Sequence, residues 1–342
     1  MPERILALSR AVSNVATEKV KEIQNATKAT RILALNAQIE AARANEHGAG
    51  FAVVAQEVKE VSARIADLTN QLTEKLQEQT SELDQLGKQL IASVRGRRLT
   101  DLALSMIDII DRNLYERSCD VRWWATDSAV IDCVGRPDDM QIEFASKRLG
   151  VILNAYTVYL DLWIVDVNGK VIANGRPDRY PMAKGTSVAN EAWFREAMGT
   201  KSGDDFVVAD ISRNEQLKGG LVTTYAAAVR EGAESQGTPI GALGIFFDWE
   251  TQSQTVVDAV RLEPEEKVRT RCLLLDSRHR IIAASDHQGV LTDSIPLNLA
   301  QGERGNYLDL QDQTVGYALT PGYETYRGLG WYGVIIQAKA PS

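Results

Sequence analysis

The first 95 residues carry a heptad repeat that only another helix can satisfy. Small and apolar residues recur at alternating steps of four and three from Ala16 to Ala44, and a second series runs from Phe51 to Leu90. This spacing places one stripe of side chains along an α-helix, and a partner helix must cover that stripe. The glycines at 45–50 permit the positive φ angles of a tight reversal. The sequence therefore predicts an antiparallel helical hairpin with its tip near 45–50.

A hairpin of this kind leaves part of each stripe uncovered. Each arm of roughly 45 residues would be about 70 Å long at about 1.5 Å rise per residue. Residues 1–95 contain almost no proline and much Ala, Glu, Gln and Leu, which favour helix. We therefore expect the hairpins of two chains to associate as a coiled coil, forming a four-helix bundle in a homodimer.

Composition excludes several classes of protein. A hydrophobic content of 44% with 25% charged residues is that of a folded chain, and the net charge of −8 argues against a nucleic-acid partner. Three cysteines (Cys119, Cys133 and Cys272) without CxxC spacing indicate a reducing compartment. No apolar run reaches the roughly 20 residues that span a bilayer. We therefore expect a soluble protein in the cytoplasm, with no membrane span.

The pattern changes after the hairpin. The cluster Arg95-Gly96-Arg97-Arg98 indicates a junction between helices, and a new helical stretch follows from about Leu99 to Val134. After an interruption at 135–138, a shorter helix is expected from about Asp139 to Tyr156. We interpret the two as a long stalk helix leading into the next domain.

From Tyr159 the apolar period becomes two, which is typical of antiparallel sheet. The hairpin around Asn168-Gly169 returns about 110 residues later around Ser277-Arg278-His279, and two glycine-rich closing strands also correspond. An internal duplication is the simplest interpretation. The predicted fold class is therefore α+β, with a duplicated antiparallel-sheet domain after the hairpin and stalk. The expected domains are the hairpin (1–95), the stalk and first module (99–262, ending in a helix at 249–262), and the second module (263–342).

The segment from Ile32 to Lys59, ILALNAQIEAARANEHGAGFAVVAQEVK, closely resembles the signalling tip of bacterial methyl-accepting chemotaxis proteins. In that family the tip docks a histidine kinase and its coupling adaptor, and packs dimers into trimers. The resemblance implies a kinase or adaptor contact and a tip polar network. The implied contact residues are Ile32, Leu35 and Val53, and the implied polar network is Glu40, Arg43 and Glu57.

Residues 99 to about 340 resemble a double Cache domain, a PAS-like sensor. The duplicated hairpins, the segment NEAWFREA from Asn190 and the closing strands carry this resemblance. Many members bind a ligand in the first module through an arginine near the aromatic pair, and Glu191 stands in that place here. With Asp210 as a second acid, walled by aromatic residues, the site would suit a cationic amine. The implied ligand-binding residues are Glu191, Trp193, Phe194, Asp210 and Tyr225.

No arrangement of residues indicates an enzyme. His47, His279 and His287 have no spacing that joins them to other metal ligands, and no GxSxG occurs. We expect neither a cofactor nor a metal. The predicted function is a chemotaxis-type transducer that senses a small molecule through the Cache domain and modulates a histidine kinase through the hairpin tip. The alternative is a coiled-coil scaffold or array component whose Cache domain binds no ligand.

Overall fold

The computed structural model describes residues 2–340, with the side chains of residues 7, 8, 10–44 and 47–340. The chain forms two compact units, Met1–Arg95 and Gly96–Ser342. The boundary between the units falls within a single helix, α2 (Ala49–Trp124).

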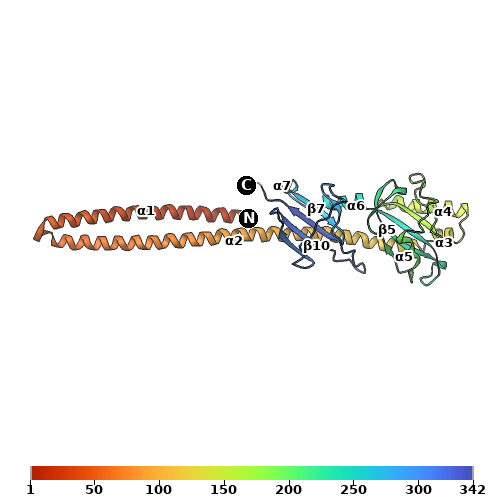
Figure 1. Ribbon diagram of the computed structural model, residues 1–342, viewed down its shortest axis with the longest axis horizontal. Helices are drawn as coiled ribbons and strands as arrows, with labels where there is room; N and C mark the ends of the chain where they lie inside the picture. Colours follow the sequence, from red (N-terminus) through yellow and green to blue (C-terminus); the bar gives the residue numbers. More distant parts are fainter. Residues whose placement is uncertain (1, 341–342) are drawn as a thin grey trace. The chain divides into compact units, whose positions relative to one another are not determined.

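The first unit is the predicted antiparallel helical hairpin, built from α1 (Pro2–Arg43) and the first part of α2 (Figure 1). Side-chain pairs fix the register of the two arms. Arg10 Nη2 lies 2.6 Å from Asp84 Oδ1, and Gln38 Nε2 donates to Gln56 Oε1 at 2.6 Å. The members of each pair lie equally far along the chain from residue 47, so the arms keep one register over this distance.

Small side chains fill the contact between the arms. The buried residues fall seven apart on each helix, at Val20, Thr27, Ala34 and Ala41 on α1 and at Ala55, Ser62 and Thr69 on α2. Their size lets the two backbones approach closely. The larger apolar residues of the repeat stay exposed, among them Ile23, Ile65 and Leu68. A single hairpin therefore covers only the small-residue part of its apolar stripe.

The turn of the hairpin differs from the prediction. Residues Asn45–Gly48 form a short 3₁₀ helix, and neither Gly48 nor Gly50 has a positive φ angle. A Cβ atom on Gly48 would collide with the carbonyl oxygen of Ala41. Gly48 is thus required by the close approach of the two helices and not by left-handed backbone geometry.

The predicted helix junction at 95–98 is wrong, because α2 continues through it to Trp124. Gly96 lies inside the helix, and a Cβ there would collide with the side chain of Asn306. The glycine therefore reflects close packing and not a break. The helix ends instead where Asp127 caps α3 (Ser128–Gly135), its carboxylate accepting a hydrogen bond from the Ala129 amide at 2.9 Å. The shorter predicted helix is confirmed as α4 (Asp139–Ala155).

The second unit contains two antiparallel sheets (Figure 1). The first has strand order β2-β1-β6-β5-β3, with β4 also paired to β5; the second has the order β8-β7-β11-β10-β9. The strands of the first sheet are β1 (Tyr159–Asp166), β2 (Val171–Asn174), β3 (Val207–Val208), β4 (Ser212–Asn214), β5 (Gly220–Arg230) and β6 (Pro239–Asp248). The strands of the second are β7 (Thr270–Leu275), β8 (Ile281–Ala284), β9 (Arg304–Leu308), β10 (Thr314–Leu319) and β11 (Tyr332–Gln337).

The remaining helices are short. Within the first module, α5 (Ala192–Met198) follows β2. The predicted connecting helix at 249–262 is confirmed only in its first part, as α6 (Trp249–Asp258), and a separate short helix, α7 (Pro264–Lys267), follows it. Pro264 occupies the first turn of α7, where its missing amide hydrogen costs nothing, so it begins a helix and does not merely end one.

Each sheet has two apolar faces. We call the face that shares a core with α2 the helix face and the opposite one the loop face. On β5 the alternation sends Tyr225 and Ala227 to the helix face and Val222 and Ala226 to the loop face. The helix faces of both sheets belong to one continuous core with α2 residues from Leu99 to Trp124.

Candidate functional site

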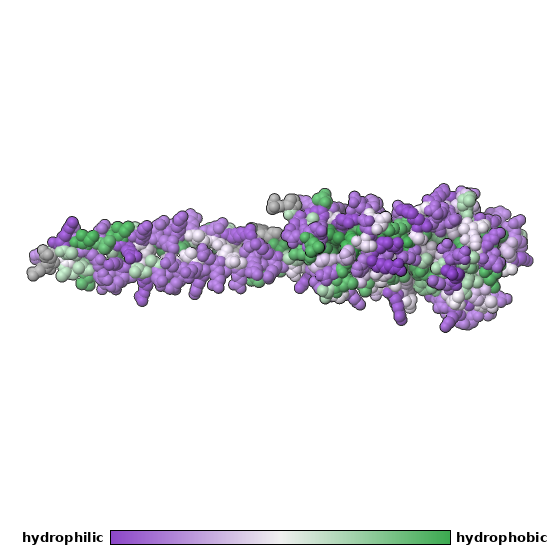
Figure 2. Space-filling view, in the orientation of Figure 1, coloured by the Kyte–Doolittle hydropathy of each residue, from purple (hydrophilic) through white to green (hydrophobic). Residues whose placement is uncertain are grey.

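The apolar residues predicted for the kinase or adaptor contact lie on the surface of the hairpin, near its turn. Ile32 is 52% exposed, Leu35 48% and Val53 61%. Figure 2 shows hydrophobic side chains gathered on the visible face of this end of the hairpin. Exposed residues of this size near one another are a typical signature of an interaction surface. Their role in docking stays a prediction.

The polar set at the tip is brought together only in part. Arg43 Nη1 lies 3.3 Å from Glu40 Oε2 one turn earlier in α1, and both side chains are about three-quarters exposed. Glu57 is exposed on α2 and, among the described residues, forms no ion pair with either of them. One chain therefore supplies two linked members of the set and one separate member.

Trp193 and Phe194 are buried on the loop face of the first sheet, where α5 positions them. The Trp193 ring meets Phe246 edge to face, with centroids 6.1 Å apart. A Cβ on Gly244 would approach Trp193 ring atoms to 3.2 Å, so the indole packs where β6 has no side chain. Both aromatic residues therefore serve as core in this structure.

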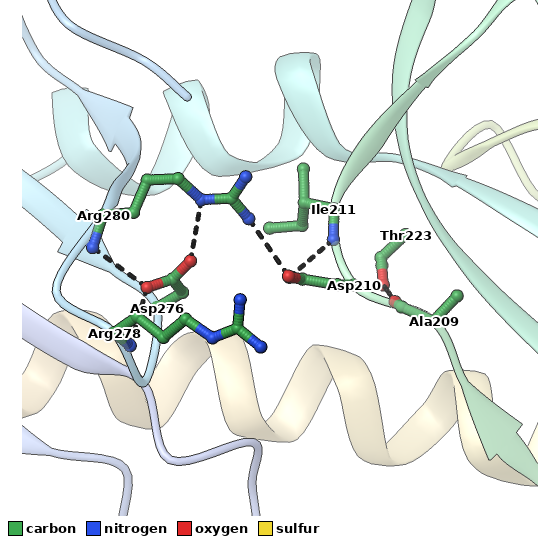
Figure 3. A network of polar contacts seen from close by, with 7 residues as sticks. All are labelled: Ala209, Asp210, Ile211, Thr223, Asp276, Arg278 and Arg280. Carbon is green, nitrogen blue, oxygen red and sulfur yellow. Dashed lines mark hydrogen bonds and ion pairs between the residues drawn. The ribbon is translucent and has the colours of Figure 1, made fainter. Parts of the chain in front are cut away.

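The two predicted ligand-binding acids lie at the surface. Glu191 is the exposed N-cap residue of α5, and its side chain makes no capping hydrogen bond. Asp210 accepts from Arg280 Nη2 of the second module at 3.1 Å (Figure 3). Arg280 is itself held by the buried Asp276, with Nε to Oδ2 at 2.8 Å. Asp210 thus contributes to a link between the two modules.

Tyr225 lies on the other face of the sheet from Trp193. It is fully buried, its ring stacks on Phe206 and its hydroxyl lies 3.3 Å from that of Tyr326. Burial raises the pKa of the Tyr225 phenol well above its usual range. The predicted pocket, two acids walled by three aromatic residues, is therefore not formed. Strand alternation separates Tyr225 from the aromatic pair, and Arg280 already neutralises one of the acids.

Sequence analysis missed a buried charged cluster under the first sheet. The guanidinium of Arg117 in α2 lies over the Tyr159 ring, 5.1 Å from its centroid, and its Nε lies 3.2 Å from Asp120 Oδ2. The Tyr159 hydroxyl donates to the same carboxylate oxygen at 2.5 Å. Burial is the largest influence on Asp120 and raises its pKa. A signal was present, because Arg117 shares the helical stripe of Leu114 and Val121.

The chain thus joins a helical hairpin with an exposed tip to a duplicated sheet domain. Residues 4–111 match the family model of the methyl-accepting chemotaxis protein (MCP) signalling domain. The predicted resemblance of the hairpin to this signalling domain is confirmed.

Two curated relatives show the extent of the match. The chain is 40% identical over 114 residues to the methyl-accepting chemotaxis protein McpQ of Pseudomonas putida, and 41% identical over 80 residues to the aerotaxis receptor of Escherichia coli. These alignments cover 31% and 23% of this chain, but only 17% and 15% of the two relatives. The relatives are chemoreceptors, which form a signalling family and not an enzyme family.

The sheet unit resembles a solved sensor domain. The ligand-binding domain of the amino-acid chemoreceptor PctC of Pseudomonas aeruginosa, solved in complex with GABA, matches with a TM-score of 0.53 at 14% identity. The match covers 71% of this chain and 99% of that one. The predicted α+β fold with a duplicated Cache-like sensor is therefore confirmed.

The predicted cytoplasmic location is wrong. The chemoreceptor sensor domains that share this fold, including that of PctC, are periplasmic ligand-binding domains. Across residues 2–340, none of the helices combines the length and the apolar character needed to cross a bilayer. Neither composition nor cysteine spacing determines the compartment in which a folded domain works.

Proposed function

We propose that this chain is a chemoreceptor-type transducer that responds to a small molecule and modulates a chemotaxis histidine kinase through its hairpin tip and a coupling adaptor. The observation that carries the proposal is the exposed tip itself. Ile32, Leu35 and Val53 are surface residues in a segment that matches a signalling domain. Exposed side chains of this size gain free energy only when a partner covers them, at roughly 25 cal/mol per Å² of buried apolar area.

The hairpin contributes to this function as a dimer. Its small buried residues hold the two arms of one chain together, while larger residues such as Ile23, Ile65 and Leu68 remain exposed. A second hairpin of the same kind would bury them in a four-helix bundle. Trimers of such dimers are a further prediction from the family resemblance.

The helix α2 is the proposed route between input and output. It supplies the second arm of the hairpin and also packs against both sheets, through Arg117 at the first and Leu99 at the second. A ligand controls the kinase only if it binds two states of this assembly with different affinities. We propose that occupancy of the first module shifts α2 and so changes how the tip holds its partners.

The test is kinase autophosphorylation with purified adaptor, with and without the full chain. We expect Glu40→Ala and Arg43→Ala to abolish the effect of the chain on the rate. A matched control is Glu22→Ala, because Glu22 and Lys19 form another exposed ion pair three residues apart on α1, at 2.8 Å, away from the tip. Exposed pairs contribute little to stability, so all three variants should stay folded. Equal loss of effect with Glu22→Ala would refute the assignment to the tip.

One observation favours the scaffold alternative. The predicted ligand-binding residues do not surround a common pocket, since Trp193 and Phe194 are core, Tyr225 faces α2 and Asp210 is paired with Arg280. Ligand binding by these residues stays a prediction. A thermal-shift screen of amines and carboxylates separates the two readings. A scaffold would enter receptor arrays and alter the kinase while no compound shifts its unfolding temperature.

A further inference from the structure

A pocket of about 370 Å³ lies beside the carboxyl end of α2 in the first module. Arg122 and Trp123 of α2 form one wall and Arg230 at the end of β5 forms another, while Asp204 and Glu234 belong to the surrounding loops. Its size falls within the range typical of small-molecule sites. None of the residues predicted to bind ligand lines it.

Arg230 brings an uncompensated charge to this pocket. The residue is only 6% exposed, yet among the described residues no carboxylate lies within ion-pair distance of it. Its Nη1 and Nη2 donate to the carbonyl oxygens of Gly237 at 2.7 Å and Thr200 at 2.6 Å, and its Nε has no hydrogen-bond partner. A buried guanidinium held by neutral groups alone is costly, so a nearby anion would stabilise it.

Two of the three nitrogens of the Arg122 guanidinium make only long contacts. Its Nη1 lies 3.4 Å from the Asp204 carbonyl oxygen, and its Nη2 lies 3.6 Å from the Cys119 sulfur. Its Nε is better satisfied, donating to the Ser118 carbonyl at 2.8 Å. A carboxylate would replace two long contacts with a charge-assisted pair, for which a guanidinium is shaped. The Arg122 guanidinium stacks over Phe206, 5.4 Å from the ring centroid, which limits its orientations.

The negative groups near the pocket are engaged elsewhere or stand at its edge. The Asp204 carboxylate accepts from the hydroxyls of Ser202 at 3.2 Å and Ser235 at 3.4 Å, and it is exposed, as is Glu234. Carbonyl groups of the last turn of α2 accept from the amides of Thr126 and Asp127. The buried side of the pocket is therefore positive and its exposed edge negative, which disfavours a ligand with several negative charges.

We propose that this pocket binds a small molecule with a single carboxylate, paired with Arg122, attracted by the buried charge of Arg230 and resting its apolar part on Trp123. Trp123 is 69% exposed, which is unusual for an indole side chain. The site lies beside α2 and is separate from the loop-face residues Trp193 and Phe194. Binding stands on these contacts alone, and only its use as a sensory input rests on the proposed function.

The test is isothermal titration of the full chain with benzoate, benzamide and terephthalate. Benzoate carries one carboxylate on a ring that can stack on Trp123, benzamide is its neutral counterpart, and terephthalate directs a second carboxylate toward the acidic edge. We expect benzoate to bind at least about tenfold more tightly than benzamide, because one charge-assisted hydrogen bond is worth that much. Benzoate should also bind more tightly than terephthalate, whose second carboxylate is repelled by the acidic edge. No binding of benzoate, or equal binding of benzamide, overturns the proposal.

Variants locate the binding. Arg122→Gln should weaken benzoate binding about tenfold or more, and Trp123→Ala should weaken it by a smaller factor. The matched control is Arg213→Gln, since Arg213 is an exposed arginine of β4 that also donates to a carbonyl oxygen, that of Gly219 at 3.1 Å. If Arg122→Gln fails to fold, Trp123→Ala carries the test. Unchanged affinity in the variant tested refutes the site. Benzoate binding without any change in kinase rate would refute the use of this pocket as a sensory input and leave the site intact.

Discussion

The two modules of the sheet unit share one backbone plan and differ in how each covers its loop face. Trp163 pairs with Asn174 in the first module and Leu273 with Ala284 in the second, both in the same antiparallel register with a bulge at equivalent places. Even the turns agree, because Asp166 and Asp276 each accept backbone amide hydrogens from residues two and four positions later. The duplication is therefore structural down to single hydrogen bonds.

The loop faces diverge. The first is covered by α5 and its flanking loops and buries the aromatic residues Trp163, Tyr180, Trp193, Phe194 and Phe246. The second is mostly aliphatic, with Tyr317 as its fully buried aromatic residue, and no helix lies in the segment between β8 and β9. The same strand order thus supports two different loop faces. The loop face of the first module has more buried aromatic residues, which can pack in the core or contact a ligand.

A polar pair has exchanged its charges between the modules. Asp161 in β1 accepts from the backbone amide of Arg176 at 3.0 Å, while at the equivalent places Arg271 donates from Nη2 to Asp286 at 3.0 Å. Asp161 is fully buried, and burial raises its pKa. The two modules thus keep a polar contact between the strand and the loop at the same place. The acid lies on the strand in the first module and on the loop in the second.

The largest expected effect comes from removing the aromatic centre of the first loop face. Trp193→Ala should lower the free energy of unfolding by about 3–5 kcal/mol, since it deletes a buried indole packed on Phe246 and Gly244. Urea unfolding at constant pH measures the change. Trp123→Ala is the control, because an exposed indole should cost about 0.5 kcal/mol or less.

A loss below about 1 kcal/mol for Trp193→Ala would mean that the first loop face is loosely packed. The two loop faces would then not differ in how tightly they are packed. The result would favour a loop face that opens to admit a ligand, as the family resemblance implies.

The fold was accessible from the sequence because its signals are periodic. Heptads predicted the hairpin, and period-two strands with a repeated turn predicted the duplicated sheets. Where single residues decided, prediction failed. Gly96 and Gly48 looked like breaks or reversals, but each is required by a close approach of another segment, a long-range contact that no local pattern reports.

The candidate ligand site was harder to predict for the same reason. The family resemblance placed Asp210 and Tyr225 in one site with Trp193. In the structure the alternation of β5 sends Tyr225 to the opposite face of the sheet, and Asp210 is paired with Arg280. The pocket at Arg122 and Arg230 joins residues over a hundred positions apart, and neither stands in a recognisable pattern. Charged residues on the apolar stripe of α2 were the available signal for the buried cluster at Arg117.

The second prediction uses the matched turns of the two modules. Gly169 has φ of +80°, and a Cβ there would lie 2.5 Å from the Cα of Ala189, so Gly169→Ala should cost about 1–3 kcal/mol of unfolding free energy. The equivalent His279 also has a positive φ, of 62°, and packs edge to face on Tyr332. His279→Gly relieves backbone strain and loses a contact, so its change should be within about 1 kcal/mol. Thermal and urea unfolding of both variants measure the difference, and equal costs would contradict the expected difference in packing between the two turns.

The smallest expected effect concerns how each module is tied to α2. At the first module, Asp120 is buried and its pKa is raised. Stability therefore falls as the pH rises above the pKa of an unfolded aspartate, because Asp120 ionises less easily in the folded protein. At the second, Arg98 Nη2 donates to Glu266 Oε2 at 2.8 Å, and this hydrogen bond lowers the pKa of Glu266 below its ordinary 4.5. Stability from this pair is present above that ordinary pKa and is lost as the pH falls through the folded value.

Glu266→Gln should therefore lower the free energy of unfolding by about 0.5–1 kcal/mol near neutral pH and by nothing once Glu266 is protonated, because Arg98 is 43% exposed and the pair is partly screened by solvent. Urea unfolding of both proteins across the acid range gives the difference. The control is Glu265→Gln, an exposed neighbour in α7 that forms no ion pair among the described residues. A difference that persists at the lowest pH would assign the effect of Glu266 to its capping of α7, where its carboxylate accepts from the Glu263 amide at 3.1 Å, and not to the tie with α2.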